Sequence, residues 1–217
     1  MNEFSPKFIS FEGGEGAGKS TQIRLLAKWL TGRGVEVVMT REPGGSTGAE
    51  EIRELLVKGE TDRWTPMSEA LLMTAARAEH VERTIKPALK RGAWVLCDRF
   101  FDSTIAYQGG ARGLGIEKMR DLQDMALHGL TPDLTFILDL PVDVGLARAC
   151  GREALREDRE DRFERMNFAF HENIRDAYLK IAEAEPDRCV VIDANRDITT
   201  LQNDLRAQVN HRFVGMQ

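Results

Sequence analysis

Cysteines are few in this sequence, and basic charge is in deficit. Three cysteines occur among the 217 residues, and none belongs to a C-x-x-C pair. Neither a disulfide framework nor a zinc site is therefore expected, and the odd count suggests a reducing compartment, the cytoplasm. The formal net charge is −5, so no basic excess marks a surface for nucleic acid, and we expect no nucleic-acid partner.

Long apolar runs are missing as well. No stretch approaches the roughly 20 residues that span a membrane, and residues 1–6 lack the character of a signal peptide. Repeats, low-complexity stretches and domain linkers are also lacking. The hydrophobic content of 42% is enough for one core of ordinary size. We therefore expect a single domain over residues 1–217 without a membrane partner.

A glycine loop near the start of the chain is the feature around which the rest is organised. Residues 13–20 read GGEGAGKS and fit the P-loop pattern G-x-x-x-x-G-K-[S/T]. An apolar run precedes the loop and residues with helical spacing follow it, which argues against a chance glycine-rich turn. Glycines let the backbone wrap round a phosphate, and the loop N–H groups form an anion nest.

The P-loop pattern assigns roles to individual side chains. Lys19 reaches the β- and γ-phosphates of a nucleoside triphosphate, and the Ser20 hydroxyl is placed for Mg²⁺. We therefore predict binding of a nucleoside triphosphate and Mg²⁺ by the following residues: Gly13, Gly14, Glu15, Gly16, Ala17, Gly18, Lys19, Ser20 and Thr21.

The rest of the chain alternates between strand-like and helical patterns. This alternation predicts an α/β fold of the P-loop NTPase type, a parallel five-stranded sheet with helices on both faces. Pro87 predicts a kink or break in one long helix. Strands are expected at 8–11, 35–40, 93–98, 134–139 and 189–193, and helices at 21–30, 48–58, 67–91, 117–128, 142–150, 162–183 and 199–213, with a short one from about 103.

Charged clusters follow several of these strands, at the sheet edge where such folds bind ligands. Asp98 beside a P-loop is suited to hold Mg²⁺, and Arg99 to hold a second anionic group through its fork; the alternative is a helix-capping ion pair. Asp139 is a rival carboxylate, ranked lower because no basic residue accompanies it. Residues 40–45 read TREPGG, a rigid turn that either faces the phosphates or only carries solvated charges.

A hydroxyl, a phenol and an amide follow the Asp-Arg pair on one helical face. Thr104, Tyr107 and Gln108 are spaced to read the hydrogen-bonding edges of a base or sugar. On the long helix, Met73 and Arg77 are four residues apart and line one spot. An arginine on an apolar face needs an anion or an acceptor.

The stretch from Arg148 to Arg165 is the most charged in the chain. One interpretation is an exposed helix with ion pairs four residues apart, each worth a few tenths of a kcal/mol. The other is a mobile lid at about 148–165 whose arginines fold over the triphosphate. Charge alone leaves both open. In the lid interpretation the nucleotide-binding and catalytic candidates are Arg148, Arg152, Arg156 and Arg159.

Two anion sites beside one metal suit phosphoryl transfer between nucleotides. Lys19 marks one site and Arg99 the other, with Arg53 from the helix after the TREPGG turn as a further candidate. A phosphate acceptor is already ionised at neutral pH, so it needs relief from charge repulsion and no general base. Closure of a lid would exclude water from the transfer.

Five motifs, in order along the chain, resemble the bacterial thymidylate kinase (dTMP kinase) family. They are FEGGEGAGKST at 11–21, TREPGG at 40–45, DRF at 98–100, AYQGG at 106–110 and DRFE at 161–164. Many enzymes share the P-loop, whereas the set of five is specific and covers essentially the whole chain. The resemblance implies a nucleoside monophosphate kinase-like fold, phosphoryl transfer from ATP to dTMP with Mg²⁺, and a homodimer.

The resemblance also implies roles position by position. Glu15 would lie by the sugar 3′-hydroxyl, and Tyr107 against the deoxyribose, where a 2′-hydroxyl would clash. Glu42 would lie near the metal and the acceptor phosphate. The other implied roles are the dTMP phosphate for Arg53 and Arg99, the metal side for Asp98, thymine for Arg77, and its edge for Thr104 and Gln108.

The sequence departs from the family pattern at Met73 and in the lid between Arg148 and Asp161, which is longer than the short form found in the family. Gly16 stands where some members carry an arginine, which resembles the bacterial type that supplies a catalytic arginine from the lid. Met73 stands where the family often has a phenylalanine stacked on the base, although a thioether can also pack on a ring. Which of Arg152, Arg156 and Arg159 is the catalytic arginine stays open.

Three other functions remain to be weighed against this one. Another nucleoside monophosphate kinase or a deoxynucleoside kinase would share the P-loop and lid but read a different base. A regulatory GTPase would carry an N-K-x-D guanine motif, which does not occur in the sequence. A non-catalytic nucleotide-binding module would not need Asp98, Arg99 and an arginine lid together.

Overall fold

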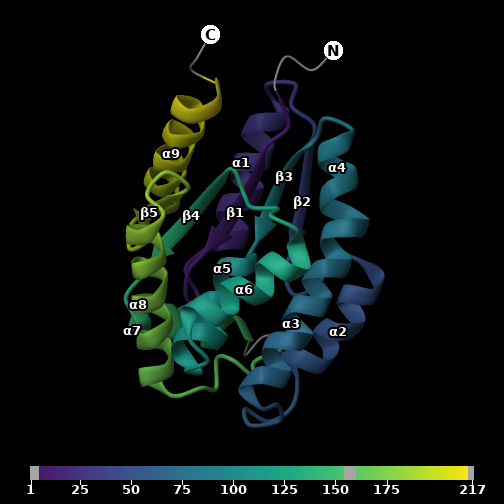
Figure 1. Cartoon of the computed structure of the whole chain (residues 1–217). Helices are drawn as coiled ribbons and strands as arrows, with labels where there is room; N and C mark the ends of the chain where they lie inside the picture. Colours follow the sequence, from purple (N-terminus) through teal and green to yellow (C-terminus); the bar gives the residue numbers. More distant parts are fainter. Residues whose placement is uncertain (1–4, 154–159, 215–217) are drawn as a thin grey trace.

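A parallel sheet forms the centre of the molecule (Figure 1). The computed structural model describes residues 5–153 and 160–214. All strands pair parallel in the order β2-β3-β1-β4-β5, so the predicted fold class is confirmed. The strands are β1 (Phe8–Glu12), β2 (Val37–Arg41), β3 (Trp94–Asp98), β4 (Leu134–Asp139) and β5 (Cys189–Asp193).

Side chains alternate between the two faces of the sheet because successive strand residues point in opposite directions. In β1, Phe8 packs into one hydrophobic core, whereas Ile9 and Phe11 pack into the other. Helices α1 (Lys19–Thr31) and α9 (Ile198–Val209) cover the second core. The first core lies under α3 (Pro66–His80), α4 (Lys86–Lys90), α5 (Phe101–Thr104), α6 (Ile116–Leu127) and α8 (Phe168–Ala184).

The described part of the chain has further helical segments, two of which, Val81–Ile85 and Ile105–Ala111, add buried side chains to the first core. The further segments are α2 (Thr47–Val57), α7 (Val142–Glu153) and three π-helical segments, Val81–Ile85, Ile105–Ala111 and Asn210–Val214. No helix within residues 5–153 and 160–214 is long and apolar enough to cross a membrane.

The helix predicted over 162–183 is wrong at its start. Residues 162–167 form turns, and α8 begins at Phe168, where the Asn167 side chain accepts from the Phe170 N–H at 2.9 Å. Arg162 is fully buried instead of facing solvent. Its guanidinium donates to the carbonyls of Leu56 and Glu60 at 3.1 and 3.0 Å, which holds the chain out of a helix.

The long helix is not broken at Pro87. Helical structure continues from Pro66 to Lys90, and its irregular part is the π-helical segment Val81–Ile85, just before the proline. A wider turn there relieves the clash of a proline ring with the preceding turn.

Candidate active site

The P-loop connects β1 to α1 through backbone conformations that suit glycine. Gly13, Gly16 and Gly18 have φ of 132°, 70° and 89°, and Gly18 caps α1. A Cβ on Gly16 would lie 2.1 Å from the carbonyl oxygen of Gly145 in α7, and one on Gly145 would lie 2.4 Å from that of Glu15. The loop is therefore seated directly on the backbone of α7, which fixes its N–H groups at the positive end of α1.

The side chains at the start of α1 meet the end of β3. Register pairs Phe11 with Asp98, which brings this carboxylate beside the P-loop. The Ser20 hydroxyl donates to Asp98 at 2.6 Å. Lys19 folds back and donates to the carbonyls of Gly13 and Gly14 at 3.1 and 3.0 Å. Burial, together with Arg99, lowers the pKa of Lys19.

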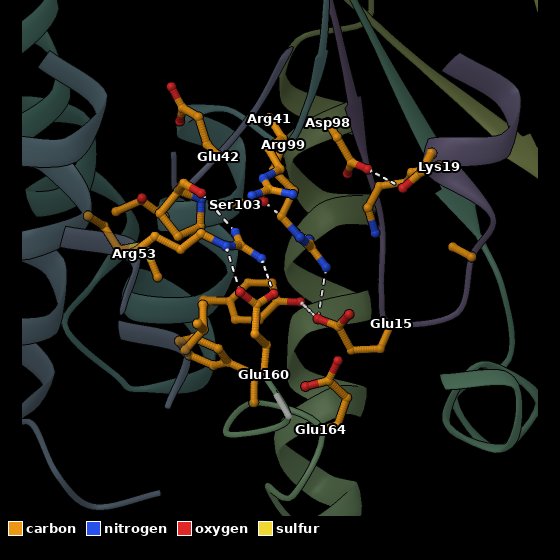
Figure 2. A pocket seen from close by; sticks show the side chains of 18 of the residues that line it. Glu15, Lys19, Arg41, Glu42, Arg53, Asp98, Arg99, Ser103, Glu160 and Glu164 are labelled. Carbon is orange, nitrogen blue, oxygen red and sulfur yellow. Dashed lines mark hydrogen bonds and ion pairs between the residues drawn. The ribbon is translucent and has the colours of Figure 1, made fainter. Parts of the chain in front are cut away.

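Arg99 links the P-loop to the helices on the other side of the cavity (Figure 2). It directly follows β3 with a left-handed φ of 70°, a strained conformation for a residue with a side chain. Its guanidinium donates to Glu15 at 2.8 Å, to Gly13 O at 3.0 Å and to the Tyr178 hydroxyl at 3.1 Å. The side chain is thereby aimed across the mouth of the P-loop.

Glu15 is held as a carboxylate by its neighbours. Burial alone would raise its pKa, but Arg99 and Lys19 lower the pKa to about 2. The Tyr107 hydroxyl donates to the same carboxylate at 2.7 Å. Tyr107 also lies with its ring centre 5.1 Å from the Arg99 guanidinium. Glu15, Arg99 and Tyr107 thus form one rigid group.

Glu12, the last residue of β1, supports this group through hydrogen bonds to residues that surround it. The fully buried Glu12 carboxylate accepts from the Phe100 N–H at 2.7 Å, the Ser103 hydroxyl at 2.6 Å and the Tyr178 hydroxyl at 3.0 Å. Burial and the nearby Asp102 raise the pKa of Glu12 to about 7. The only local signal for this role is a charge at the end of an apolar strand.

Glu42, the third residue of the TREPGG segment, is also buried. Its oxygens accept from Arg77 Nε at 2.6 Å and bond His80 Nδ1 at 2.9 Å. The other ring nitrogen of His80 bonds the Thr40 hydroxyl at 2.7 Å. His80 thus braces the turn from two sides, and both Glu42 oxygens already have protein partners.

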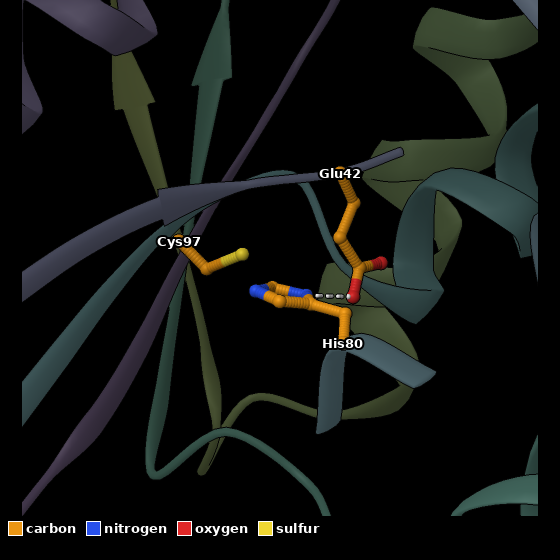
Figure 3. A group of neighbouring side chains, drawn as sticks. All are labelled: Glu42, His80 and Cys97. Atoms are coloured by element: carbon orange, nitrogen blue, oxygen red, sulfur yellow. Dashed lines mark hydrogen bonds and ion pairs between the residues drawn. The ribbon is translucent and has the colours of Figure 1, made fainter. Parts of the chain in front are cut away.

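Glu42, His80 and Cys97 bring their potential metal-ligand atoms within 4.8 Å of one another (Figure 3). Both ring nitrogens of His80 are used in hydrogen bonds, and the Cys97 thiol donates to Arg99 O at 3.0 Å. Burial, with Glu42, raises the pKa of Cys97 well above its ordinary value, so the thiol stays protonated. This chemistry fits a structural brace better than a cation site.

The base-reading candidates surround one end of the cavity. Arg77 donates from Nη1 to Thr104 at 2.9 Å and to Gln123 at 2.7 Å, and from Nη2 to Phe100 O at 3.1 Å. Met73 is half-buried and lines the same cavity. Gln108 donates to the buried Glu69 at 2.9 Å. Neither Gln123 nor Glu69 was predicted, because nothing local in the sequence separates them from other polar helix residues.

Arg53 meets a carboxylate in the cavity. Its Nε and Nη2 donate to Glu160 at 3.2 and 2.7 Å, and its Nη1 to Pro43 O at 2.8 Å. Figure 2 shows the Glu160 side chain reaching Arg53 from the end of the charged stretch. A phosphate that binds Arg53 must share or replace this carboxylate.

A single cavity of about 490 Å³ brings most predicted residues together. Gly13 and Gly14 line a smaller cavity instead, beside Asp139, which pairs with Arg175 at 2.7 Å. Predicted residues along the larger cavity are Glu15, Gly16, Ala17, Gly18, Lys19, Ser20, Thr21, Glu42, Arg53, Met73, Arg77, Asp98, Arg99, Thr104, Tyr107 and Gln108. Lining residues that were not predicted include Arg24, Ser103, Glu160 and Phe163.

Among the arginines predicted for the lid, Arg148 is the one whose side chain the structure describes. Arg148 is exposed on α7 and is not among the lining residues. Arg152 belongs to the backbone of α7, but its side chain lies outside the described part of the chain, as do Arg156 and Arg159 altogether.

Comparison with known proteins identifies relatives over nearly the whole chain. The sequence model of the thymidylate kinase family matches residues 11–205. A thymidylate kinase from Caulobacter vibrioides is 58% identical over 88% of this chain and 89% of its own, and one from Afipia carboxidovorans is 52% identical over 95% and 90%. The crystal structure of thymidylate kinase from Ehrlichia chaffeensis, 36% identical, superposes with a TM-score of 0.76 over 95% of this chain and 99% of that one.

Proposed function

The chain belongs to the thymidylate kinase family, and from this premise we propose how its own residues carry out the reaction. That reaction transfers a phosphoryl group from ATP to dTMP and gives ADP and dTDP, a step of nucleotide biosynthesis. The observation that carries the assignment of residues is one cavity lined by the P-loop, by Arg99 and by the polar group around Arg77.

The donor side is formed by the P-loop. Its N–H groups and Lys19 bind the β- and γ-phosphates of ATP, with Thr21 extending the loop into α1. Lys19 leaves the Gly13 and Gly14 carbonyls when phosphate oxygens replace them, because a charged acceptor binds an ammonium more strongly. The lowered pKa of Lys19 does not prevent this, since phosphate favours the charged form.

The acceptor side is formed by Arg99 and Arg53. These guanidinium groups hold the dTMP phosphate, with Glu160 giving up Arg53 as the phosphate enters. Glu42 acts near that phosphate through its bonds to Arg77 and His80. Attack on the γ-phosphate needs no general base, because the attacking oxygen is already ionised. The arginines reduce the repulsion between the two nucleotides.

We also propose a magnesium site at Ser20 and Asp98, with Glu42 as a further candidate whose oxygens already bond Arg77 and His80. Hydroxyl and carboxylate oxygens are typical ligands of Mg²⁺. The Ser20 hydroxyl oxygen and a carboxylate oxygen of Asp98 lie 2.6 Å apart at the cavity wall. Mg²⁺, when bound, neutralises charge on the phosphate oxygens. In the protein alone, the Ser20–Asp98 hydrogen bond keeps both side chains oriented toward the P-loop.

Base and sugar recognition is assigned to the opposite wall. Arg77, Thr104 and Gln108 face thymine, and Met73 packs on its ring. Tyr107 lies against the deoxyribose, and Glu15 near its 3′-hydroxyl. The rigid Glu15–Arg99–Tyr107 group supports this, because a fixed phenol can exclude a 2′-hydroxyl by contact.

We further propose a lid with its catalytic arginine, a cellular location and an oligomeric state. A lid at about 148–165 would supply the catalytic arginine, Arg152, Arg156 or Arg159, and Arg148 would contact ATP. The protein would act in the cytoplasm, which suits its unpaired cysteines. A homodimer would bury the exposed apolar side chains of three neighbouring helices, Leu55 on α2, Leu71 on α3 and Met125 on α6; light scattering of the purified protein would give its mass.

Activity assays with purified protein test the site assignment. Lys19→Ala and Arg99→Ala are expected to lose at least about a hundredfold in kcat, because each removes a charge that stabilises the transferring group. Circular dichroism should show that both variants are folded. Lys28 is exposed on α1, the helix that begins with Lys19, and the control variant Lys28→Ala should keep full activity. Near-full activity of either site variant would contradict the assignment.

A panel of acceptors tests base recognition. With ATP and Mg²⁺, we expect ADP formation to be strongest with dTMP among dTMP, dUMP, UMP, CMP, AMP and GMP. ADP release without dependence on an acceptor would instead indicate an ATPase.

A further inference from the structure

A buried carboxylate lies behind the base-reading wall and is not itself among the residues that line the cavity. Glu69 on α3 is fully buried. Arg162 donates to it at 2.5 Å, and Arg112 at 3.1 and 3.3 Å. Its remaining partner is Gln108, whose Nε2 donates to Oε1 at 2.9 Å.

This contact decides which end of the Gln108 amide faces the cavity. A side-chain amide has a donor end and an acceptor end, and the two are exchanged by a simple rotation. A carboxylate paired with two guanidinium groups can only accept, so it fixes Nε2 on the side of α3. Gln108 lines the cavity, and its carbonyl Oε1 is therefore the end presented to a ligand.

The neighbouring hydroxyl is fixed in the opposite sense. Thr104 Oγ1 accepts from Arg77 Nη1 at 2.9 Å, so its own O–H points away from that bond and can donate. Arg77 cannot turn to release it, because Glu42 and Phe100 O hold its other nitrogens. The wall thus presents one acceptor, from Gln108, and one donor, from Thr104.

This order of acceptor and donor matches one kind of pyrimidine edge. Thymine and uracil carry an N3–H donor beside the O4 acceptor, an imide edge. Cytosine carries the reverse, an N3 acceptor beside an N4–H₂ donor. A buried mismatch between such groups is costly, because each unpaired polar atom loses its solvation without a replacement.

We propose that Glu69 is a positioning residue that sets the direction of the Gln108 amide and thereby selects an imide edge over that of cytosine. The inference rests on the proposed base-reading roles of Gln108 and Thr104 and adds the group that gives Gln108 its polarity. Arg162 and Arg112 serve in turn to hold the side chain of Glu69 in position.

The ratio of kcat/KM for dTMP to that for dCMP measures this selectivity. Glu69→Gln replaces the carboxylate by an amide of the same shape, which can face Gln108 with either end. We expect the ratio to fall at least about tenfold, mainly through a higher KM for dTMP and a lower KM for dCMP. A merely structural role would lower both activities together and leave the ratio unchanged.

Matched variants show whether Glu69 acts through Gln108. Arg112→Gln removes an ion pair from the same carboxylate but leaves the bond to Gln108, and should keep the ratio within about twofold. Gln108→Met should lower the ratio by itself, and adding Glu69→Gln to it should then have no further effect. Glu69→Asp keeps the charge between the arginines but withdraws it from Gln108, and serves if Glu69→Gln does not fold.

The outcomes separate the inference from its premise. A wild-type ratio near one would overturn the base-reading assignment of Gln108 itself. A high wild-type ratio that folded Glu69 variants retain would overturn only the role of Glu69. If Glu69→Gln lowers the dTMP-to-dCMP ratio as much in the Gln108→Met background as in the wild type, Glu69 acts by another route. That result also overturns the role proposed for Glu69.

Discussion

Glu12 offers a prediction whose size follows from the structure. Its carboxyl is fully buried beneath the Arg99 turn, where burial and the nearby Asp102 raise the pKa from 4.5 to about 7, against the opposing effects of Ser103 and Arg99. The folded protein therefore binds the Glu12 proton more tightly than the unfolded chain does. The sign follows from linkage: stability falls as the pH rises from about 4.5 to about 7.

The magnitude comes from the same two pKa values. They give a loss of about 1 kcal/mol by pH 5 and about 3 kcal/mol by pH 8. Glu12→Gln removes the titration. Whatever the amide itself costs, the difference in unfolding free energy between variant and wild type should move in favour of the variant by about 2 kcal/mol from pH 5 to pH 8.

Urea denaturation at pH 5 and pH 8 measures this difference for both proteins. Ser10→Ala is the control, because it removes a buried hydroxyl of the same strand, bonded to Thr135 at 2.7 Å, but no titrating group. Its effect on stability should be the same at both pH values. If Glu12→Gln behaves like this control, the raised pKa of Glu12 is refuted.

Two further predictions concern the sugar and the P-loop. Tyr107→Ala should lower the preference for dUMP over UMP at least about tenfold in kcat/KM, because the ring that meets a 2′-hydroxyl is gone, whereas Tyr107→Phe should keep it; unchanged selectivity in Tyr107→Ala would remove that role. Gly145→Ala should raise the KM for ATP about tenfold or more, because its methyl would lie 2.4 Å from Glu15 O and displace the loop. Gly151→Ala, on the same helix and with no described atom within 4 Å of the added methyl, should not raise that KM, and a similar KM in both variants would count against the seating of the P-loop on α7.

The contact between Arg53 and Glu160 affects how activity assays of variants at the acceptor side are interpreted. In this arrangement a carboxylate occupies the guanidinium that we assign to the acceptor phosphate. The affinity for dTMP therefore reflects the exchange of one anion for another, which weakens binding without altering the transfer step. Variants at the acceptor side should be compared through kcat as well as KM.

Local pattern was sufficient for most of the architecture. Apolar runs of strand length and the spacing of apolar residues in helices predicted the order of elements and the parallel sheet. The P-loop was predictable because its glycines, Lys19 and Ser20 are adjacent in sequence between one strand and one helix, whereas its close contact with Gly145 of α7 left no signal in the sequence. Asp98 could be placed because parallel strands end at the same edge of a sheet. The start of α8 was missed although Asn167 is a recognisable cap residue.

Only the tertiary structure decided which side chains pair with which across the cavity. Glu69 lies 39 residues from Gln108, and Glu160 lies 107 residues from Arg53. Such pairs leave no periodic signal in the sequence, because each partner alone resembles an ordinary polar or charged surface residue on a helix or turn. Burial turns these charges into fixed neighbours, since an unpaired charge inside the protein is costly. The sequence by itself therefore determined the sheet, the P-loop and the class of chemistry, whereas packing of distant segments determined the orientation of the groups that surround the substrate.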